Sequence, residues 1–171
     1  MSETAKARKT LSPFCEGLGI DIGFGGDPIN KNSITFDLPN PYTKGKVKQI
    51  LQGNCKSLNF ICDEVFDYVY SSHVLEDFTY QELPKIIKEW RRILKVGGFL
   101  VINCPDQQRF LSHCKKTGQD INYNHKESDF SLQTFTAIVE KTGMWQTVFT
   151  KPFAGNYSWY LVLRKINYKL L

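Results

Sequence analysis

The sequence predicts a single α/β domain built around a mainly parallel sheet. Three observations support this fold class. Apolar segments of strand length alternate with segments of helical periodicity. The first apolar segment ends in a glycine-rich turn, and two strand-like segments close the chain. The 171 residues suit one domain with a substantial core, so residues 1–171 are expected to form one unit, with residues 1–16 as an N-terminal tail.

The strands are predicted from short runs rich in apolar and β-branched residues. These runs include "LGIDI", "SITFD", "VFDYVYSS" and "GFLVINC". They place strands at 18–22, 33–37, 65–72 and 98–104, and a further short strand is expected at 50–52. Only about ten residues separate the first two strands, which is short for a parallel crossover, so any helix between them is expected to be short.

Apolar side chains recur at helical spacing between the last two of these strands: Leu83, Ile86, Ile87, Trp90, Ile93 and Leu94. Thr79 and Glu82 form a capping box at the start of this helix, and Gly97-Gly98 is its expected stop. Because Pro84 removes a backbone donor near the first turn, the helix either begins a turn later or follows a separate turn.

The second half of the chain is predicted in three parts. Residues 105–130 are polar and form an irregular insertion on the substrate side, with one short helix at 107–116. A helix follows at 131–143, where apolar residues share one face. The segments "MWQTVFT" and "SWYLVLRK", separated by a loop with Gly155-Asn156, predict a C-terminal antiparallel hairpin.

The composition is typical of a globular protein without a membrane span. Hydrophobic residues make up 42% of the chain, and no apolar run approaches the ~18 residues that a span needs. The N-terminal stretch "MSETAKARKT" lacks the apolar core of a secretory signal, and the five cysteines form no CxxC pair. A cytoplasmic protein without a metal site is expected. The net charge of +5 is scattered and does not indicate nucleic acid binding.

The glycine-rich turn lacks the spacing of a dinucleotide site, because Pro28 stands where G-x-G-x-x-G needs its third glycine. With Asp21 two residues before Gly23, the stretch instead resembles motif I of the class I S-adenosylmethionine-dependent methyltransferases. "FDYVYSSHVLEDF" (66–78) is similar to that family's fourth-strand segment, and "IIKEWRRILKVGGFLVINCP" to its following helix, turn and fifth strand. These pieces come in the family's order, and the resemblance extends from residue 17 to about 166.

The resemblance implies a Rossmann-like fold, with a mostly parallel seven-stranded sheet, a reversed last strand and helices on both faces. It also implies an enzyme that binds S-adenosyl-L-methionine and releases S-adenosyl-L-homocysteine. The implied cofactor-binding residues are Asp21, Gly23, Phe24, Gly25, Asp37, Leu38, Asn54, Cys55, Ser71 and Ser72.

Asp37 is the implied partner of both ribose hydroxyls, since a carboxylate can accept two hydrogen bonds at once; the alternative is a solvated aspartate at a strand end. Asn54 stands where the family often has an acid facing the adenine amino group, and its amide oxygen can accept that bond. Asp21 is expected to order the turn or to meet the amino group of the cofactor.

His73 is the catalytic candidate, a base for a hydroxyl nucleophile, because imidazole titrates near neutrality. The alternative is a structural or capping histidine. His125 and Glu127 lie in the insertion that the family uses for substrate contacts, and they are candidate substrate-binding residues unless this loop is merely solvated. Metal binding by His113, His125 and Glu127 is the least favoured alternative.

The expected reaction is methyl transfer to an oxygen or nitrogen of a small-molecule or glycan-like acceptor. The short N-terminal segment predicts no N-terminal lid. The 105–130 segment, a second copy of the chain or another partner chain is therefore expected to cover the pocket, unless a large acceptor such as a glycan suits an open mouth. The alternatives are a non-catalytic cofactor-binding regulatory or scaffold module and a nucleotide-dependent oxidoreductase, which Pro28 disfavours.

Overall fold

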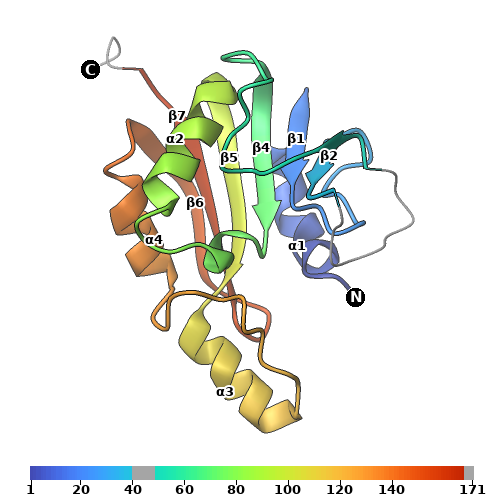
Figure 1. The fold of residues 1–171 in the computed structure, drawn as a ribbon, viewed down its shortest axis with the longest axis vertical. Coiled ribbons are helices and arrows are strands. Elements are labelled where there is room, and N and C mark those ends of the chain that lie inside the picture. Colours follow the sequence, from blue (N-terminus) through green and yellow to red (C-terminus); the bar gives the residue numbers. More distant parts are fainter. Residues whose placement is uncertain (40–48, 168–171) are drawn as a thin grey trace.

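The computed structural model describes residues 1–39 and 49–167. These residues form one seven-stranded sheet in the order β3-β2-β1-β4-β5-β7-β6 (Figure 1). The strands are β1 (Gly19–Ile22), β2 (Ile34–Asp37), β3 (Leu51–Gln52), β4 (Phe66–Ser72), β5 (Leu94–Pro105), β6 (Trp145–Ala154) and β7 (Ser158–Lys165). The first five strands pair in parallel, whereas β7 runs antiparallel to both β5 and β6. The predicted fold class, including the C-terminal hairpin, is confirmed.

Helices cover both faces of the sheet. The helices are α1 (Glu3–Leu11), α2 (Leu83–Ile93), α3 (Gln107–Thr117) and α4 (Leu132–Val139), with short 3₁₀ turns η1 (Ser12–Phe14) and η2 (Leu75–Asp77). Successive side chains of β4 alternate between the faces. Val69 packs in the cluster that holds α2 and α4, and Tyr68 and Tyr70 pack in the cluster that holds α1. Figure 1 shows α3 projecting beyond the end of the sheet.

The N-terminal segment 1–16, expected as a tail, contains α1 and η1. Ser2 caps α1 by accepting a hydrogen bond from the Ala5 amide, and Ala7 and Leu11 are fully buried. Arg8 ties the helix to the turn after β1 through the Ile29 and Pro28 carbonyls. This helix has a weak signal in the sequence, because only two apolar positions, four residues apart, are fully buried against the sheet.

Helix α2 begins at Leu83, after a separate turn in which Glu82 accepts hydrogen bonds from the amide and hydroxyl of Thr79. This is the second of the two starts that Pro84 allows. The helix ends before the expected glycine stop, because Leu94 already pairs with Phe66 as the first residue of β5. Gly98 lies within that strand instead, so close to the Asp67 carbonyl that a Cβ atom would lie 2.9 Å from its oxygen.

Candidate functional site

A cavity of about 570 Å³ opens at the carboxyl ends of β1, β2, β3 and β4. It is the edge at which parallel α/β sheets bind ligands. Nine of the residues singled out from the sequence line it: Gly23, Phe24, Gly25, Asp37, Leu38, Asn54, Cys55, Ser72 and His73. The structure therefore brings together side chains that are up to 50 positions apart in the sequence.

The floor of this cavity is the glycine-rich turn after β1. Gly23 has a φ of +71°, and its amide donates to the Phe36 carbonyl at 2.8 Å. A side chain at this position would clash with Cγ2 of Val74, so both the backbone conformation and the available space require glycine. Gly25 also has a positive φ, of +58°. Main chain without side chains is thus exposed to the cavity at the end of β1.

Asp37 ends β2 and lies beside the turn. Its Oδ1 accepts a hydrogen bond from the Leu38 amide at 2.8 Å, and its Oδ2 accepts one from the Gly25 amide at 3.3 Å. Each carboxylate oxygen can accept more than one hydrogen bond. Two backbone donors therefore fix the orientation of the carboxylate and leave it capacity to accept hydrogen bonds from a ligand in the cavity.

Asp21 is fully buried and does not line the cavity. Its Oδ2 accepts a hydrogen bond from the Ile29 amide at 2.6 Å, while its Oδ1 has no hydrogen-bond partner among the described residues. Burial raises the pKa of Asp21 to about 8, and the nearby Asp27 and Asp37 carboxylates act in the same direction. In this structure the carboxyl group stabilises the turn after β1 through the Ile29 amide, from a buried position outside the cavity.

Asn54 and Cys55 reach the cavity from the segment after β3. The Asn54 Oδ1 accepts a hydrogen bond from the Lys56 amide at 3.0 Å, and the Cys55 carbonyl accepts one from the Trp90 indole at 2.9 Å. The side chain of Asn54 therefore shapes its own turn. Its oxygen keeps a second lone pair for a ligand.

The two serines at the end of β4 lie in different places. Ser71 is buried, its hydroxyl donates to the Ile22 carbonyl at 3.0 Å, and it does not line the cavity. Ser72 lines the cavity, and its Oγ accepts a hydrogen bond from the Asn103 side chain at 2.9 Å.

His73 follows β4 in a left-handed conformation, with a φ of +56°. Its Nε2 lies 3.2 Å from the Ser158 hydroxyl and 3.8 Å from a Glu3 carboxylate oxygen, and its Nδ1 lies 3.5 Å from Oε1 of Glu76. Burial lowers the pKa of His73 to about 4. The imidazole is therefore neutral at pH 7, so one of its two nitrogens carries no proton.

The two candidates in the insertion lie apart from the main cavity. His125 lines a second cavity, and its Nδ1 lies 2.6 Å from Oε1 of Gln107. Glu127 accepts a hydrogen bond from the Tyr80 amide at 2.9 Å, which fixes the segment before α2. His113 packs its ring against Tyr157. Within the described ranges, no three His, Cys, Asp or Glu side chains are grouped as metal ligands.

Several cavity residues had no clear signal in the sequence. Ser2, Glu3 and Thr4 line the cavity from the start of α1, and Asn124 and Lys126 line it from the insertion. The predicted absence of an N-terminal lid is thus wrong in part, because the first turn of α1 forms one wall. The serine N-cap was a possible sign of the helix, but nothing local places that helix beside β4.

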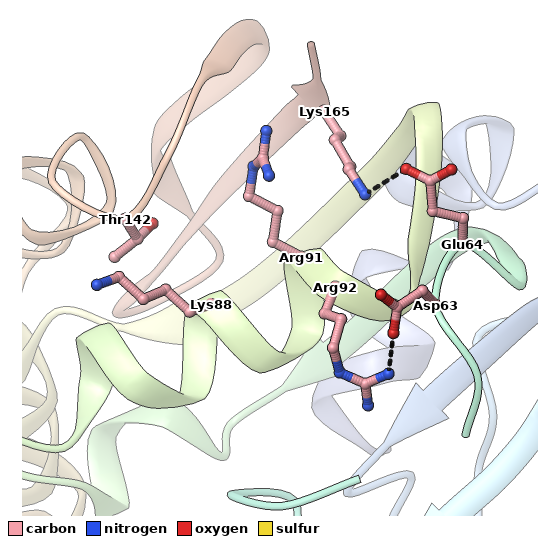
Figure 2. Close-up of a pocket in the computed structure, with 7 residues that line it drawn as sticks. All are labelled: Asp63, Glu64, Lys88, Arg91, Arg92, Thr142 and Lys165. Atoms are coloured by element: carbon pink, nitrogen blue, oxygen red, sulfur yellow. Dashed lines mark hydrogen bonds and ion pairs between the residues drawn. The ribbon is translucent and has the colours of Figure 1, made fainter. Parts of the chain in front are cut away.

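A polar pocket of about 530 Å³ lies at the opposite end of the sheet, before β4 and after α2 (Figure 2). Both acidic side chains in its described lining are paired, Asp63 with Arg92 at 2.6 Å and Glu64 with Lys165 at 3.1 Å. No helix in the described parts of the chain is long and apolar enough to span a membrane.

Comparison with known proteins shows similarity to methyltransferases. A family model described as a methyltransferase domain matches residues 29–102, from just after the glycine-rich turn to within β5. Among solved structures, an S-adenosylmethionine-dependent methyltransferase from Archaeoglobus fulgidus is 17% identical with a TM-score of 0.71, over 95% of this chain and 92% of that chain. No match is found among curated proteins.

Two further solved structures have the same fold. One from Thermotoga maritima, an S-adenosylmethionine-dependent methyltransferase described as a possible histamine N-methyltransferase, is 20% identical with a TM-score of 0.67, over 96% of this chain and 89% of that chain. The other is a complex between the Haloferax volcanii Trm112 methyltransferase activator and a methyltransferase, matched at 15% identity and a TM-score of 0.65, over 96% of this chain and 89% of that chain.

Proposed function

We propose that the chain is a class I S-adenosylmethionine-dependent methyltransferase, which its methyltransferase-domain match over residues 29–102 and its fold support. On this premise, its main cavity binds the cofactor for methyl transfer to an oxygen or nitrogen of a small-molecule or glycan-like acceptor. The observation that carries the proposal is the meeting of a side-chain-free turn at the end of β1 with the Asp37 carboxylate at the end of β2, in one cavity of about 570 Å³.

The residues present fit the parts of S-adenosylmethionine. The backbone from Gly23 to Gly25 would pass beneath its methionine part, and the Asp37 carboxylate would accept hydrogen bonds from the ribose hydroxyls. Asn54 and Cys55 would border the adenine. Ser72 and His73, which follow from the same strand, would border the sulfur and the acceptor.

The bound cofactor supplies a methyl group made electrophilic by a positively charged sulfur. The protein holds the acceptor in line with the carbon–sulfur bond, and such positioning supplies most of the rate enhancement. The acceptor oxygen or nitrogen would form the new bond to this methyl group, and the carbon–sulfur bond would break with its electron pair left on sulfur. The acceptor also loses a proton. His73 would take it from a hydroxyl acceptor, although its low pKa makes it a weak base.

Part of the cover over the site comes from the chain itself, through Ser2, Glu3 and Thr4. A partner chain over the remaining mouth stays part of the proposal. The Haloferax volcanii complex, a methyltransferase with an activator, supports that arrangement by analogy.

Calorimetric titration with S-adenosylmethionine and S-adenosylhomocysteine tests the proposal. Asp37→Ala should weaken binding of both by about tenfold to a hundredfold, because charge-assisted hydrogen bonds to the ribose are lost. The matched control is Asp63→Ala, which removes an aspartate at the opposite end of the sheet and should leave the affinity unchanged.

Equal affinity of the wild type and Asp37→Ala would remove Asp37 from the site. No binding to the wild-type protein would refute the cofactor site altogether. Tight binding with no methylated product from any acceptor would instead favour the non-catalytic module.

A further inference from the structure

A second cavity, of about 350 Å³, lies beside the proposed cofactor cavity. It is lined by residues that follow β4, by α3 and the insertion after it, and by the loop before β7. Among the described residues, His73 alone lines both cavities. A molecule in the second cavity would therefore lie next to the imidazole that borders the cofactor site.

Carboxylates and amides dominate the polar lining of this second cavity. Glu76 and Asp120 contribute carboxyl groups, and the described lining includes no lysine or arginine. Glu76 is only 1% exposed. Its Oε1 lies 3.5 Å from His73 Nδ1 and 3.9 Å from His125 Nε2, both of them nitrogens of neutral or weakly basic rings.

The other carboxyl oxygen of Glu76 has no hydrogen-bond partner in the part of the chain that the structure describes. The weak thiol donor of Cys104 interacts with the carboxyl group but carries no positive charge. In its ionised form this buried carboxylate would lack a positively charged partner, which is costly. The site is therefore built in a way that a positively charged ligand would complete.

Aromatic rings also line this cavity. The rings of Phe110 and Tyr157 meet edge to face with their centroids 5.2 Å apart, and Phe110 also contacts the His125 ring at 4.8 Å. Phe110, Cys114 and Tyr157 form a small hydrophobic cluster separate from the two main cores. The faces of such rings attract cations.

We propose that the second cavity is the acceptor site and that it selects a positively charged amine, whose ammonium group is bound by the Glu76 carboxylate against the Phe110 and Tyr157 rings. This inference rests on the proposed function and narrows its acceptor class from oxygen or nitrogen to an amine. Because an ammonium nitrogen has no lone pair, the Glu76 carboxylate would first take one of its protons. The neutral amine nitrogen would then form the bond to the methyl carbon, while the carbon–sulfur bond would break and leave its electron pair on sulfur. A neutral hydroxyl acceptor would supply no positive charge to stabilise the ionised form of Glu76.

The protonation state of Glu76 gives the proposal a second observable consequence, a pH dependence of amine binding. Burial raises the pKa of Glu76 to about 8, so the empty site is mainly protonated at pH 7. The titratable groups around it are Glu3, His73, Asp77, Cys104 and His125. Because an ammonium group binds the ionised carboxylate, its binding expels a proton, and amine affinity should rise between pH 6 and pH 8.

The test is titration of the wild-type protein, saturated with S-adenosylhomocysteine, with matched amines and alcohols: phenethylamine against phenethyl alcohol, and cyclohexylamine against cyclohexanol. Methyl glucoside serves as the neutral sugar. Each amine should bind about tenfold or more tightly than its alcohol. Titrations in buffers of different ionisation enthalpy should show proton release with the amines only.

Glu76→Gln should abolish the tenfold preference for amines, whereas Glu140→Gln, an exposed charge at the end of α4, should retain it. Equal binding of amines and alcohols, binding of neither, or tighter binding of methyl glucoside would overturn the amine site while S-adenosylhomocysteine still binds. Failure of S-adenosylhomocysteine itself to bind would refute the proposed function instead. The comparison within the wild type stands even if Glu76→Gln does not fold.

Discussion

Asp21 shows how one buried carboxyl group organises a binding turn without facing the ligand cavity. It lies within β1, and its hydrogen bond to the Ile29 amide closes the loop that presents Gly23 and Gly25. Burial raises its pKa to about 8. The folded protein therefore holds a proton on this group at pH values where the unfolded chain has lost it.

This protonation has a measurable effect on stability. Between about pH 4 and pH 8 the folded state binds the proton more tightly, so Asp21 makes the free energy of unfolding fall as pH rises, by roughly 1 kcal/mol per pH unit. Asp21→Asn keeps an oxygen for the Ile29 amide but cannot ionise, so its unfolding free energy should decline less steeply. Urea unfolding from pH 5 to pH 8 measures the slope, with Asp63→Asn as the control. Parallel slopes for Asp21→Asn and the wild type would contradict the assignment.

The site residues at strand ends were predictable one by one, because a glycine turn or an acid directly after an apolar run must lie at the edge of a parallel sheet. The serines of β4 show the limit of this reasoning. Adjacent residues of a strand point to opposite faces, so Ser71 turns inward to the Ile22 carbonyl while Ser72 lines the cavity. His125 and Glu76 meet through an irregular loop, and no periodicity in the sequence predicts that contact.

At the scale of elements, the segment between β3 and β4 contains no helix of its own in the described structure. Side chains of helix α2 hold this segment in position instead. Trp90 donates to the Cys55 carbonyl, Glu89 accepts from the Leu58 amide, and Arg92 donates to the Leu58 and Ile61 carbonyls. Residues 53–55, which line the cavity, are therefore fixed by side chains of a helix that does not touch it.

Trp90→Phe should reveal this indirect support. The substitution removes the indole donor to Cys55 and leaves a small void in the core, so it should cost about 2–4 kcal/mol of stability. It should also weaken S-adenosylhomocysteine binding severalfold, because the segment that carries Asn54 loses its anchor. Calorimetry and thermal unfolding give the two readouts.

Trp159→Phe is the matched control. Trp159 is equally buried in the same cluster, but its indole donates to the Pro105 carbonyl, away from residues 53–55. It should lose similar stability and keep its affinity for S-adenosylhomocysteine. If both variants lose affinity alike, the effect is general destabilisation and the anchoring role of Trp90 is wrong.

Most helices and strands were predictable because their buried side chains recur in the sequence as a periodic pattern of apolar residues. The strands were expected within a few residues of their observed bounds, and α2 has a continuous apolar stripe from Leu83 to Ile93. Helix α1 left almost no pattern, since Ala7 and Leu11 are its only fully buried apolar contacts with the sheet. Its position depends instead on distant partners such as the Ile29 carbonyl.

At the scale of the whole molecule, the α-helices on only one face of the sheet reach the main cavity in the described structure. Helices α2 and α4 pack into the larger core on one face. On the other face α1 packs against β4 and β5, and its first turn reaches the proposed cofactor cavity. There Glu3 lies near His73 and accepts a hydrogen bond from the Tyr157 hydroxyl at 3.0 Å. The stability of α1 and occupancy of the cavity should therefore be linked.

Hydrogen exchange measured by mass spectrometry can detect this linkage. A ligand that binds only when α1 is docked must make local opening of α1 rarer. S-adenosylhomocysteine should therefore slow exchange of the amides in 3–11 severalfold, while those of α4, which lie on the opposite face outside the cavity, should change little. A ligand that binds without altering exchange in 3–11 would show that the cavity forms independently of α1, and that this helix serves the core alone.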